Sequence, residues 1–175
     1  SAATLGDLAD RVRSFAAARK DRIVIGFGAS AYAVAERRLP TRADLDEAAG
    51  NRPVYIVKYD GHGAVANSAL LGKLPPKAPD PRGYDGESGR LNQEAFFAAT
   101  DFVTGSVSLP AVLEGMLRAA DGMAEKGIGM IHSVTGVGFP LDADVALESL
   151  FARGLRNMLP YRVFFQTMDA AKAKK

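Results

Sequence analysis

Residues 110–134, PAVLEGMLRAADGMAEKGIGMIHSV, decide the fold, because a long helical segment runs directly into a short apolar one. Proline is favoured in the first turn of a helix, so the pattern predicts a helix over Pro110–Lys126. The glycine-flanked run Ile128–Val134 predicts a strand. A second helix is predicted over Leu141–Arg153 and a second strand over Tyr161–Met168. Since helices that alternate with strands act as crossovers, we expect a parallel sheet.

The alternation extends upstream of this stretch. An amphipathic helix is predicted over residues 4–19, with Thr4 as its N-cap. Two β-branched segments, Arg22–Gly28 and Pro53–Asp60, predict strands. The expected fold class is therefore α/β.

Shorter helices are expected around those strands. Thr41 and Asp44 have the spacing of a capping box, which predicts a helix through Ala48. The alanine-rich segment Ala29–Leu39 is compatible with a helix, and Ala64–Leu71 predicts another short one.

Residues 73–89 hold four prolines and three glycines, so we expect a long exposed loop there. The loop divides the chain into a predicted domain of residues 1–88 and another of residues 89–175. The second domain opens with a helix over Gln93–Val103.

Composition excludes several classes of protein. The 175 residues, 47% hydrophobic and 24% charged, are enough for a sizeable core. No apolar run approaches the roughly 18 residues that span a bilayer, so we expect no membrane partner. The net charge of +2 is too small for a phosphate-binding surface, so we expect no nucleic-acid partner. The chain has no cysteine, and the cytoplasm is the expected compartment. It begins at Ser1, and we expect it to be a piece of a longer protein.

The first predicted strand ends in Gly26-Phe27-Gly28-Ala29-Ser30-Ala31, a G-x-G-x-x-A pattern. In a Rossmann-like domain such glycines bring helix amides close to the pyrophosphate of NAD or FAD. The acidic partner expected about 20 residues later is missing, because Asp60 lies much farther along. A structural turn is therefore favoured, and a nucleotide-binding domain that uses Gly26 and Gly28 is the alternative.

The segment Asp60-Gly61-His62-Gly63-Ala64-Val65-Ala66-Asn67-Ser68 places an acid, an imidazole, an amide and a hydroxyl just past a strand end. His62, Asn67 and Ser68 are therefore candidate substrate-binding residues. In the structural alternative, Asp60 and His62 bond to local backbone while Asn67 and Ser68 cap a helix. The residues alone leave both interpretations open.

His132 follows an apolar run and is expected near the carboxyl end of a strand, where α/β barrels place their sites. Glu94 is a candidate catalytic carboxylate, although an acid stabilised at a helix start is the favoured interpretation. The chain has only two histidines and no H-x-H pair, so nitrogen ligands cannot complete a zinc site here. We expect no metal ligand in this chain.

Several segments, in order, resemble the metal-dependent amidohydrolase superfamily, in the branch of YtcJ-like proteins and N-substituted formamide deformylase. Residues 39–46, LPTRADLD, with the following Arg52-Pro53-Val54, resemble one stretch of that branch. Asp60-Gly61-His62-Gly63 with Asn67-Ser68-Ala69-Leu70 resembles another. The glycine segment 26–28 and the strand 127–132 also resemble parts of it. Together these segments span most of residues 20–166.

The resemblance implies an inserted α/β domain followed by the first βα units of a TIM-like barrel, incomplete in this chain. It implies hydrolysis of amide-type C–N bonds, not peptide bonds, in a small-molecule substrate by metal-activated water. The divalent metal, expected to be zinc, would be held by residues upstream and downstream, so the chain alone is expected to be inactive.

The resemblance also suggests roles for the candidate residues. His62, with Asn67 or Ser68, would contact substrate or fix the inserted domain, and His132 would support the site. Gln93 stands where the branch has a glutamate, which weakens a carboxylate role for the neighbouring Glu94. A further alternative is a non-catalytic domain that self-associates, and we expect a homo-oligomer that forms through exposed strands.

Overall fold

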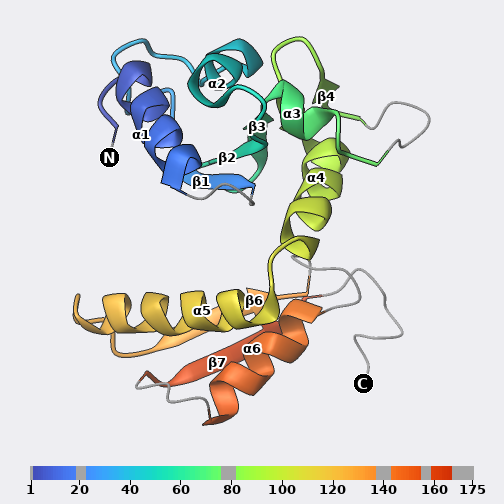
Figure 1. The fold of residues 1–175 in the computed structure, drawn as a ribbon. Coiled ribbons are helices and arrows are strands. Elements are labelled where there is room, and N and C mark those ends of the chain that lie inside the picture. Colours follow the sequence, from blue (N-terminus) through green and yellow to red (C-terminus); the bar gives the residue numbers. More distant parts are fainter. Residues whose placement is uncertain (1, 19–22, 76–81, 137–142, 155–158, 167–175) are drawn as a thin grey trace. The chain divides into compact units, whose positions relative to one another are not determined.

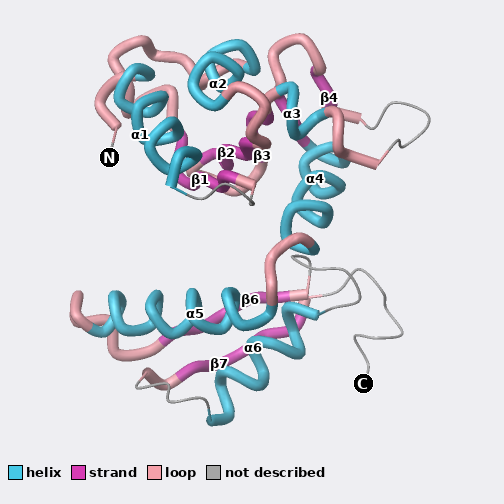
Figure 2. The backbone as a smooth tube through the Cα atoms, viewed as in Figure 1, coloured by secondary structure: helices cyan, strands magenta, loops and turns pink. Residues whose placement is uncertain are grey.

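The computed structural model describes residues 2–18, 23–75, 82–136, 143–154 and 159–166. It divides into two compact units, Ser1–Val103 and Thr104–Lys175. Figure 1 labels most of their elements, and Figure 2 separates helix from strand. In chain order the elements are α1 (Leu5–Ala18), β1 (Val24–Ala29), α2 (Arg42–Ala49), β2 (Val54–Lys58), β3 (Gly63–Ala66), α3 (Ser68–Leu71), β4 (Tyr84–Asp85), β5 (Arg90–Asn92), α4 (Gln93–Gly105), α5 (Leu109–Ala124), β6 (Ile131–Thr135), α6 (Ala143–Gly154) and β7 (Tyr161–Phe165).

The two predicted helix starts in the first unit are confirmed by their capping bonds. The Asp7 amide donates to Thr4 Oγ1 at 3.0 Å, and the Thr4 amide donates to Asp7 Oδ2 at 3.1 Å. Thr41 and Asp44 form a complete capping box at the start of α2. Local hydrogen bonding therefore fixes where these helices begin.

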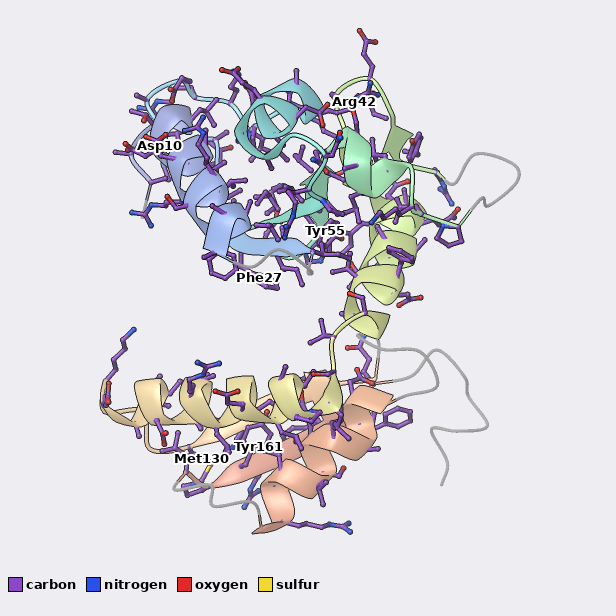
Figure 3. The ribbon with its side chains drawn as sticks, in the orientation of Figure 1. Asp10, Phe27, Arg42, Tyr55, Met130 and Tyr161 are labelled. Carbon is purple, nitrogen blue, oxygen red and sulfur yellow. The ribbon has the colours of Figure 1, made fainter. Side chains whose placement is uncertain are left out.

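The first unit is a mixed sheet with helices on both faces. Its strand order is β1-β2-β3-β5-β4, in which β1 and β2 are parallel and the other pairs antiparallel. One face is covered by α1 and α2, through side chains such as Val12 and Leu45. The other is covered by α3 and α4, through Leu70 and Phe96. Figure 3 shows Tyr55 among the side chains of this unit, and its hydroxyl lies 2.8 Å from Thr100 Oγ1 of α4.

Two short predicted helices differ in the structure. No helix forms between Ser30 and Thr41, where the chain makes turns instead. The predicted helix over Ala64–Leu71 is wrong, because residues 63–66 form β3 and only Ser68–Leu71 is helical. Alanines have high helix propensity, but here β3 pairs with both β2 and β5, and this tertiary pairing decides.

The predicted loop over residues 73–89 is not wholly irregular. β4 pairs with β5, and the Asp85 carboxylate closes the turn between them by accepting the amides of Glu87 and Ser88, both at 3.1 Å. Residues 76–81 lie outside the described part of the chain, as do the predicted strand ends at residues 22 and 167–168 and the helix start at Leu141.

The second unit contains the predicted helix, strand, helix, strand order. β6 and β7 pair in parallel, from Ile131 opposite Tyr161 to Thr135 opposite Phe165, so the parallel sheet is confirmed. A small core of Ala120, Phe151 and Leu159 joins α5 and α6 to this sheet.

The predicted domains of residues 1–88 and 89–175 stay a proposal. The compact units divide between Val103 and Thr104. The reason is that β5 pairs with β3 and α4 packs on the first sheet. The identification of the units as an inserted domain and a partial barrel stays a prediction. Among the described residues no single helix is long and apolar enough to cross a membrane, and α4 and α5 meet that criterion only when joined as a bent pair.

Candidate functional site

The glycine segment lies at the carboxyl end of β1. Its pairing with β2 is irregular between Phe27 and Ala29, so Gly28 is skipped, and the φ of Gly28 is 88°. A nucleotide-binding turn would need a helix to begin here, and the chain makes turns until Arg42 instead. The structure therefore favours the structural turn over the NAD- or FAD-binding alternative that used Gly26 and Gly28.

His62 lies in the turn of the β2–β3 hairpin, just beyond the carboxyl end of β2. Its Nδ1 is 2.6 Å from the carbonyl oxygen of Asp60, and its amide donates to Asp60 Oδ1 at 3.2 Å. The Lys58 ammonium, 2.8 Å from Asp60 Oδ2, holds the pKa of that carboxyl below its usual range. The imidazole is exposed, so local bonds orient the ring while it stays accessible to a ligand.

Asn67 is completely buried, and its amide is fully engaged. Its Oδ1 accepts the amides of Val54 at 2.9 Å and Leu70 at 3.1 Å. Its Nδ2 donates to the carbonyls of Arg52 at 2.8 Å and Gly50 at 3.4 Å. In this arrangement Asn67 caps α3 and ties it to the start of β2, and no part of its amide faces solvent.

Ser68 is exposed and is bonded to α2. Its amide donates to Asp46 Oδ1 at 2.9 Å, and its hydroxyl donates to Asp46 Oδ2 at 2.6 Å. These bonds give Ser68 a structural role in joining α3 to α2.

The structure does not bring His62 together with Asn67 and Ser68. β2 and β3 are antiparallel, with Val57 opposite Ala64 and Tyr55 opposite Ala66. His62 lies in the turn at one end of this hairpin, whereas Asn67 lies beside the start of β2 at the other end. Residues 60–68, which suggested a single site, therefore extend along the length of β3 from the hairpin turn to Asn67.

Glu94 is in the first turn of α4 and is well exposed, and its Oε1 lies 3.3 Å from Arg82 Nη2. This arrangement fits the acid at a helix start that the sequence favoured. The preceding Gln93 has a φ of 48°, so the backbone turns sharply where β5 joins the helix.

His132 is the second residue of β6 and not near its carboxyl end, so that expectation is wrong. The strand begins three residues later than predicted. The His132 ring is exposed, its Nε2 is 3.0 Å from Met130 Sδ, and its centroid is 5.6 Å from that of Phe164. Figure 3 labels Met130 just ahead of this strand.

The residue at the carboxyl end of β6 is Thr135, which the sequence analysis did not select. It is buried, and its hydroxyl donates to Asp144 Oδ2 at 3.0 Å. The Gly136 amide donates to the same oxygen at 2.9 Å. In the sequence, the only signal for this pair is an acidic residue, Asp144, at the start of a helix that follows shortly after a strand. These bonds hold the strand end to the start of α6.

The described residues include no group of three or more histidine, aspartate or glutamate side chains that could hold a metal ion. His62 and His132 belong to different compact units. The described residues therefore do not fit a resident catalytic metal, and no hydrolytic step follows from them alone.

One protein family matches nearly the whole chain. The sequence model of the amidohydrolase family matches residues 1–174. N-substituted formamide deformylase from Arthrobacter pascens is 37% identical over 67 residues, which are 38% of this chain and 12% of that protein.

Two solved structures have a similar fold. An uncharacterized metal-dependent hydrolase from Pyrococcus horikoshii OT3 matches with a TM-score of 0.57 and 22% identity over 95% of this chain and 31% of its own. One from Pyrococcus furiosus matches with a TM-score of 0.56 and 21% identity, over 93% of this chain and 32% of its own. The chain thus spans about a third of the solved proteins that it matches.

Proposed function

The chain belongs to the amidohydrolase family, and we propose from this that it is a segment of a metal-dependent amidohydrolase that hydrolyses amide-type C–N bonds other than peptide bonds. The family match across residues 1–174 is the observation that carries the proposal. Support for a metal comes from the names of the similar solved proteins, which are metal-dependent hydrolases. Support for an amide-type small-molecule substrate comes from the deformylase relative.

In the longer protein, a divalent metal such as zinc would lower the pKa of a bound water and polarise the substrate carbonyl. Because the described residues of this chain offer no ligand cluster, we propose that the ligands lie in other segments. We accordingly propose that this chain shapes part of the substrate cavity and is inactive alone. The cytoplasm is the proposed compartment.

The second unit supports the proposal of an incomplete TIM-like barrel. In such a barrel each parallel strand has helices on its outer face and packed side chains on its inner face. α5 and α6 cover one face of the β6–β7 pair, whereas Val134 and Phe164 on the other face are 64% and 48% exposed. The uncovered face is the one that further strands of a barrel would enclose.

His62 is the residue that we propose for substrate contact. It is exposed, it follows the carboxyl end of a parallel strand, and local hydrogen bonds fix its ring. The hydrogen bonds of Asn67 and Ser68 favour a structural role, in which both residues hold α3 in place. They would then affect the substrate site only indirectly, through the sheet. His132 remains a proposed supporting residue, on the uncovered face of the second sheet.

Kinetics of the longer enzyme test these roles. We expect His62→Ala to lower kcat/KM for an N-substituted formamide by about tenfold or more, as loss of one substrate hydrogen bond would. His132→Ala serves as the matched imidazole control and should have the smaller effect. Unchanged kinetics for His62→Ala would remove His62 from the site.

The isolated chain provides the test of the whole proposal. With zinc present we expect no turnover of N-substituted formamides by the 175-residue chain, while the longer enzyme is active. Metal-dependent turnover by the chain alone would contradict the proposal that the metal is held elsewhere.

A second candidate function, self-association without catalysis, is favoured by the same uncovered face. Parallel strands with open edges and exposed apolar residues tend to pair with other chains. We expect the chain to form dimers or larger species at micromolar concentration. A monomeric mass by light scattering would contradict this expectation.

A further inference from the structure

The turn of the β2–β3 hairpin holds the His62 ring in one orientation. The Gly61 amide donates to the carbonyl oxygen of Lys58 at 3.0 Å, which closes the turn. Gly61 has a φ of 70°, a conformation that glycine adopts at little cost. The His62 amide donates to Asp60 Oδ1 at 3.2 Å. These backbone bonds set the position of the Asp60 carbonyl group beside the ring.

The contact between the ring and this carbonyl group decides which ring nitrogen carries the hydrogen. His62 Nδ1 lies 2.6 Å from the carbonyl oxygen of Asp60. A carbonyl oxygen can only accept a hydrogen bond, so Nδ1 is the donor. A neutral imidazole has one N–H and one acceptor nitrogen. In the neutral ring of His62, Nε2 is therefore the acceptor.

The acceptor nitrogen is accessible to a ligand. The imidazole is exposed, and within the described part of the chain His62 Nε2 forms no hydrogen bond. The Lys58 ammonium is bonded to Asp60 Oδ2 at 2.8 Å, so these opposite charges offset each other near the ring. The ligand group that complements Nε2 is therefore a hydrogen-bond donor that needs no charge of its own, such as an amide N–H.

We propose that His62 Nε2 accepts a hydrogen bond from the N–H group of a secondary amide substrate. This inference rests on the proposed hydrolysis of amide-type C–N bonds and narrows its substrate class. An N-monosubstituted formamide has such an N–H, whereas an N,N-disubstituted formamide has none. A site that bonds an N–H discriminates against an analogue that lacks it, because the acceptor is then left unpaired. His62 is thus a specificity-determining residue for amides that retain an N–H.

The second histidine provides an internal control for the state of the ring. His132 Nε2 lies 3.0 Å from Met130 Sδ, and a thioether sulfur can only accept. The neutral ring of His132 therefore carries its hydrogen on Nε2, the opposite of His62. The chain has only these two histidines, so their imidazole signals can be told apart by one substitution.

Imidazole nitrogen NMR of the 175-residue chain tests the ring assignment without any substrate. At about pH 8.5, where an ordinary histidine is neutral, the hydrogen should be on Nδ1 of His62 and on Nε2 of His132. His132→Ala removes one set of signals and identifies the other. A hydrogen on Nε2 of neutral His62 would overturn the inference, whatever the activity of the longer enzyme.

The substrate preference of the longer enzyme tests the recognition of the N–H. N-Butylformamide has this group, and N-butyl-N-methylformamide has a methyl group in its place. His62→Ala should lower kcat/KM about tenfold for the first amide, as loss of one hydrogen bond would, and less than about twofold for the second. If the second amide is not turned over, its inhibition constant should change less than about twofold. Equal losses for both amides would overturn the inference.

Two further variants separate recognition from a general effect on the enzyme. His62→Gln keeps an acceptor oxygen on the side chain and should restore part of the preference for N-butylformamide. His132→Ala should change kcat/KM for both amides by the same factor, because His132 is not the proposed acceptor. Failure of the proposed hydrolysis would look different, since the longer enzyme would then turn over neither amide while His62 still carried its hydrogen on Nδ1.

Discussion

The two sheets of this chain differ in how completely helices cover them. In the first unit, β3 and all but the last residue of β2 are buried, with helices on both faces. In the second unit, residues 131–134 of β6 and 161–164 of β7 alternate between half-buried and exposed, since α5 and α6 cover one face only. Parallel strands are normally buried on both faces. The first sheet thus has helices on both faces, and the second sheet has helices on one face only.

The chain spans about a third of its solved relatives, which is why the incomplete barrel is a proposal about the second sheet. The observations that bear on function also divide between the two units. The accessible His62 belongs to the first unit. The parallel pair β6–β7, on which the proposed barrel depends, belongs to the second unit.

The largest effect is expected in the core of the first unit. Leu45 in α2 has no exposed surface, so Leu45→Ala should lower the free energy of unfolding of this unit by about 2–5 kcal/mol. Urea titration followed by amide signals of the first unit measures the loss. A change below about 1 kcal/mol would mean that this core is loosely packed.

Removal of the buried amide at Asn67 should have the next largest effect. Asn67→Ala leaves the Val54 amide and the Arg52 carbonyl without their side-chain partner. We expect a loss of about 2–3 kcal/mol in the same urea titration, because unsatisfied buried groups are costly. Ser68→Ala is the control, and its exposed hydroxyl should contribute less than about 1 kcal/mol. If Asn67→Ala is harmless, its bonds do not stabilise the sheet.

One substitution made in both sheets tests the comparison directly. Val54→Thr places a hydroxyl at a fully buried position of β2 and should cost about 1–3 kcal/mol. Val134→Thr makes the same change at a position of β6 that is 64% exposed and should change stability by less than about 0.5 kcal/mol. Similar losses of stability at both positions would show that the face of the second sheet that carries Val134 is covered.

The smallest effect is expected at the cap of α2. Thr41→Ala removes the capping hydroxyl and should lower the free energy of unfolding by about 1 kcal/mol.

The Arg38 guanidinium and the Thr41 amide hold the pKa of Asp44 well below its ordinary value of 3.8. Since the folded pKa is lowered, this carboxylate stabilises the fold above about pH 4 and loses that effect as the pH falls further. Urea titrations at pH 7 and pH 3 should therefore show a smaller cost of Asp44→Asn at pH 3, and an unchanged cost would contradict this role.

The sequence predicted the longer elements, the N-cap Thr4 and the Thr41–Asp44 capping box because their signals are local. The Thr41–Asp44 spacing and the helix–strand order of residues 110–168 depend on neighbours within a few turns. The prediction from sequence failed where pairing between distant segments determines the structure. Ala64 and Ala66 favour a helix by propensity, but they are strand residues between β2 and β5.

The candidate site was harder to predict for the same reason. The sequence placed His62, Asn67 and Ser68 within one short segment, and β3 separates them along the sheet. It placed His132 near a strand end because the start of β6 was predicted too early. The buried Thr135–Asp144 pair depends on a contact across nine residues, for which no periodic pattern exists.

Amide hydrogen exchange of the isolated chain tests most directly whether one sheet is complete and the other is not. We predict that amides of β2 and β3, corrected for intrinsic rates, exchange at least about 100-fold more slowly than those of β6 and β7, because complete burial limits opening. Equal protection of the two sheets would contradict the account, since the second sheet would then be as fully covered as the first.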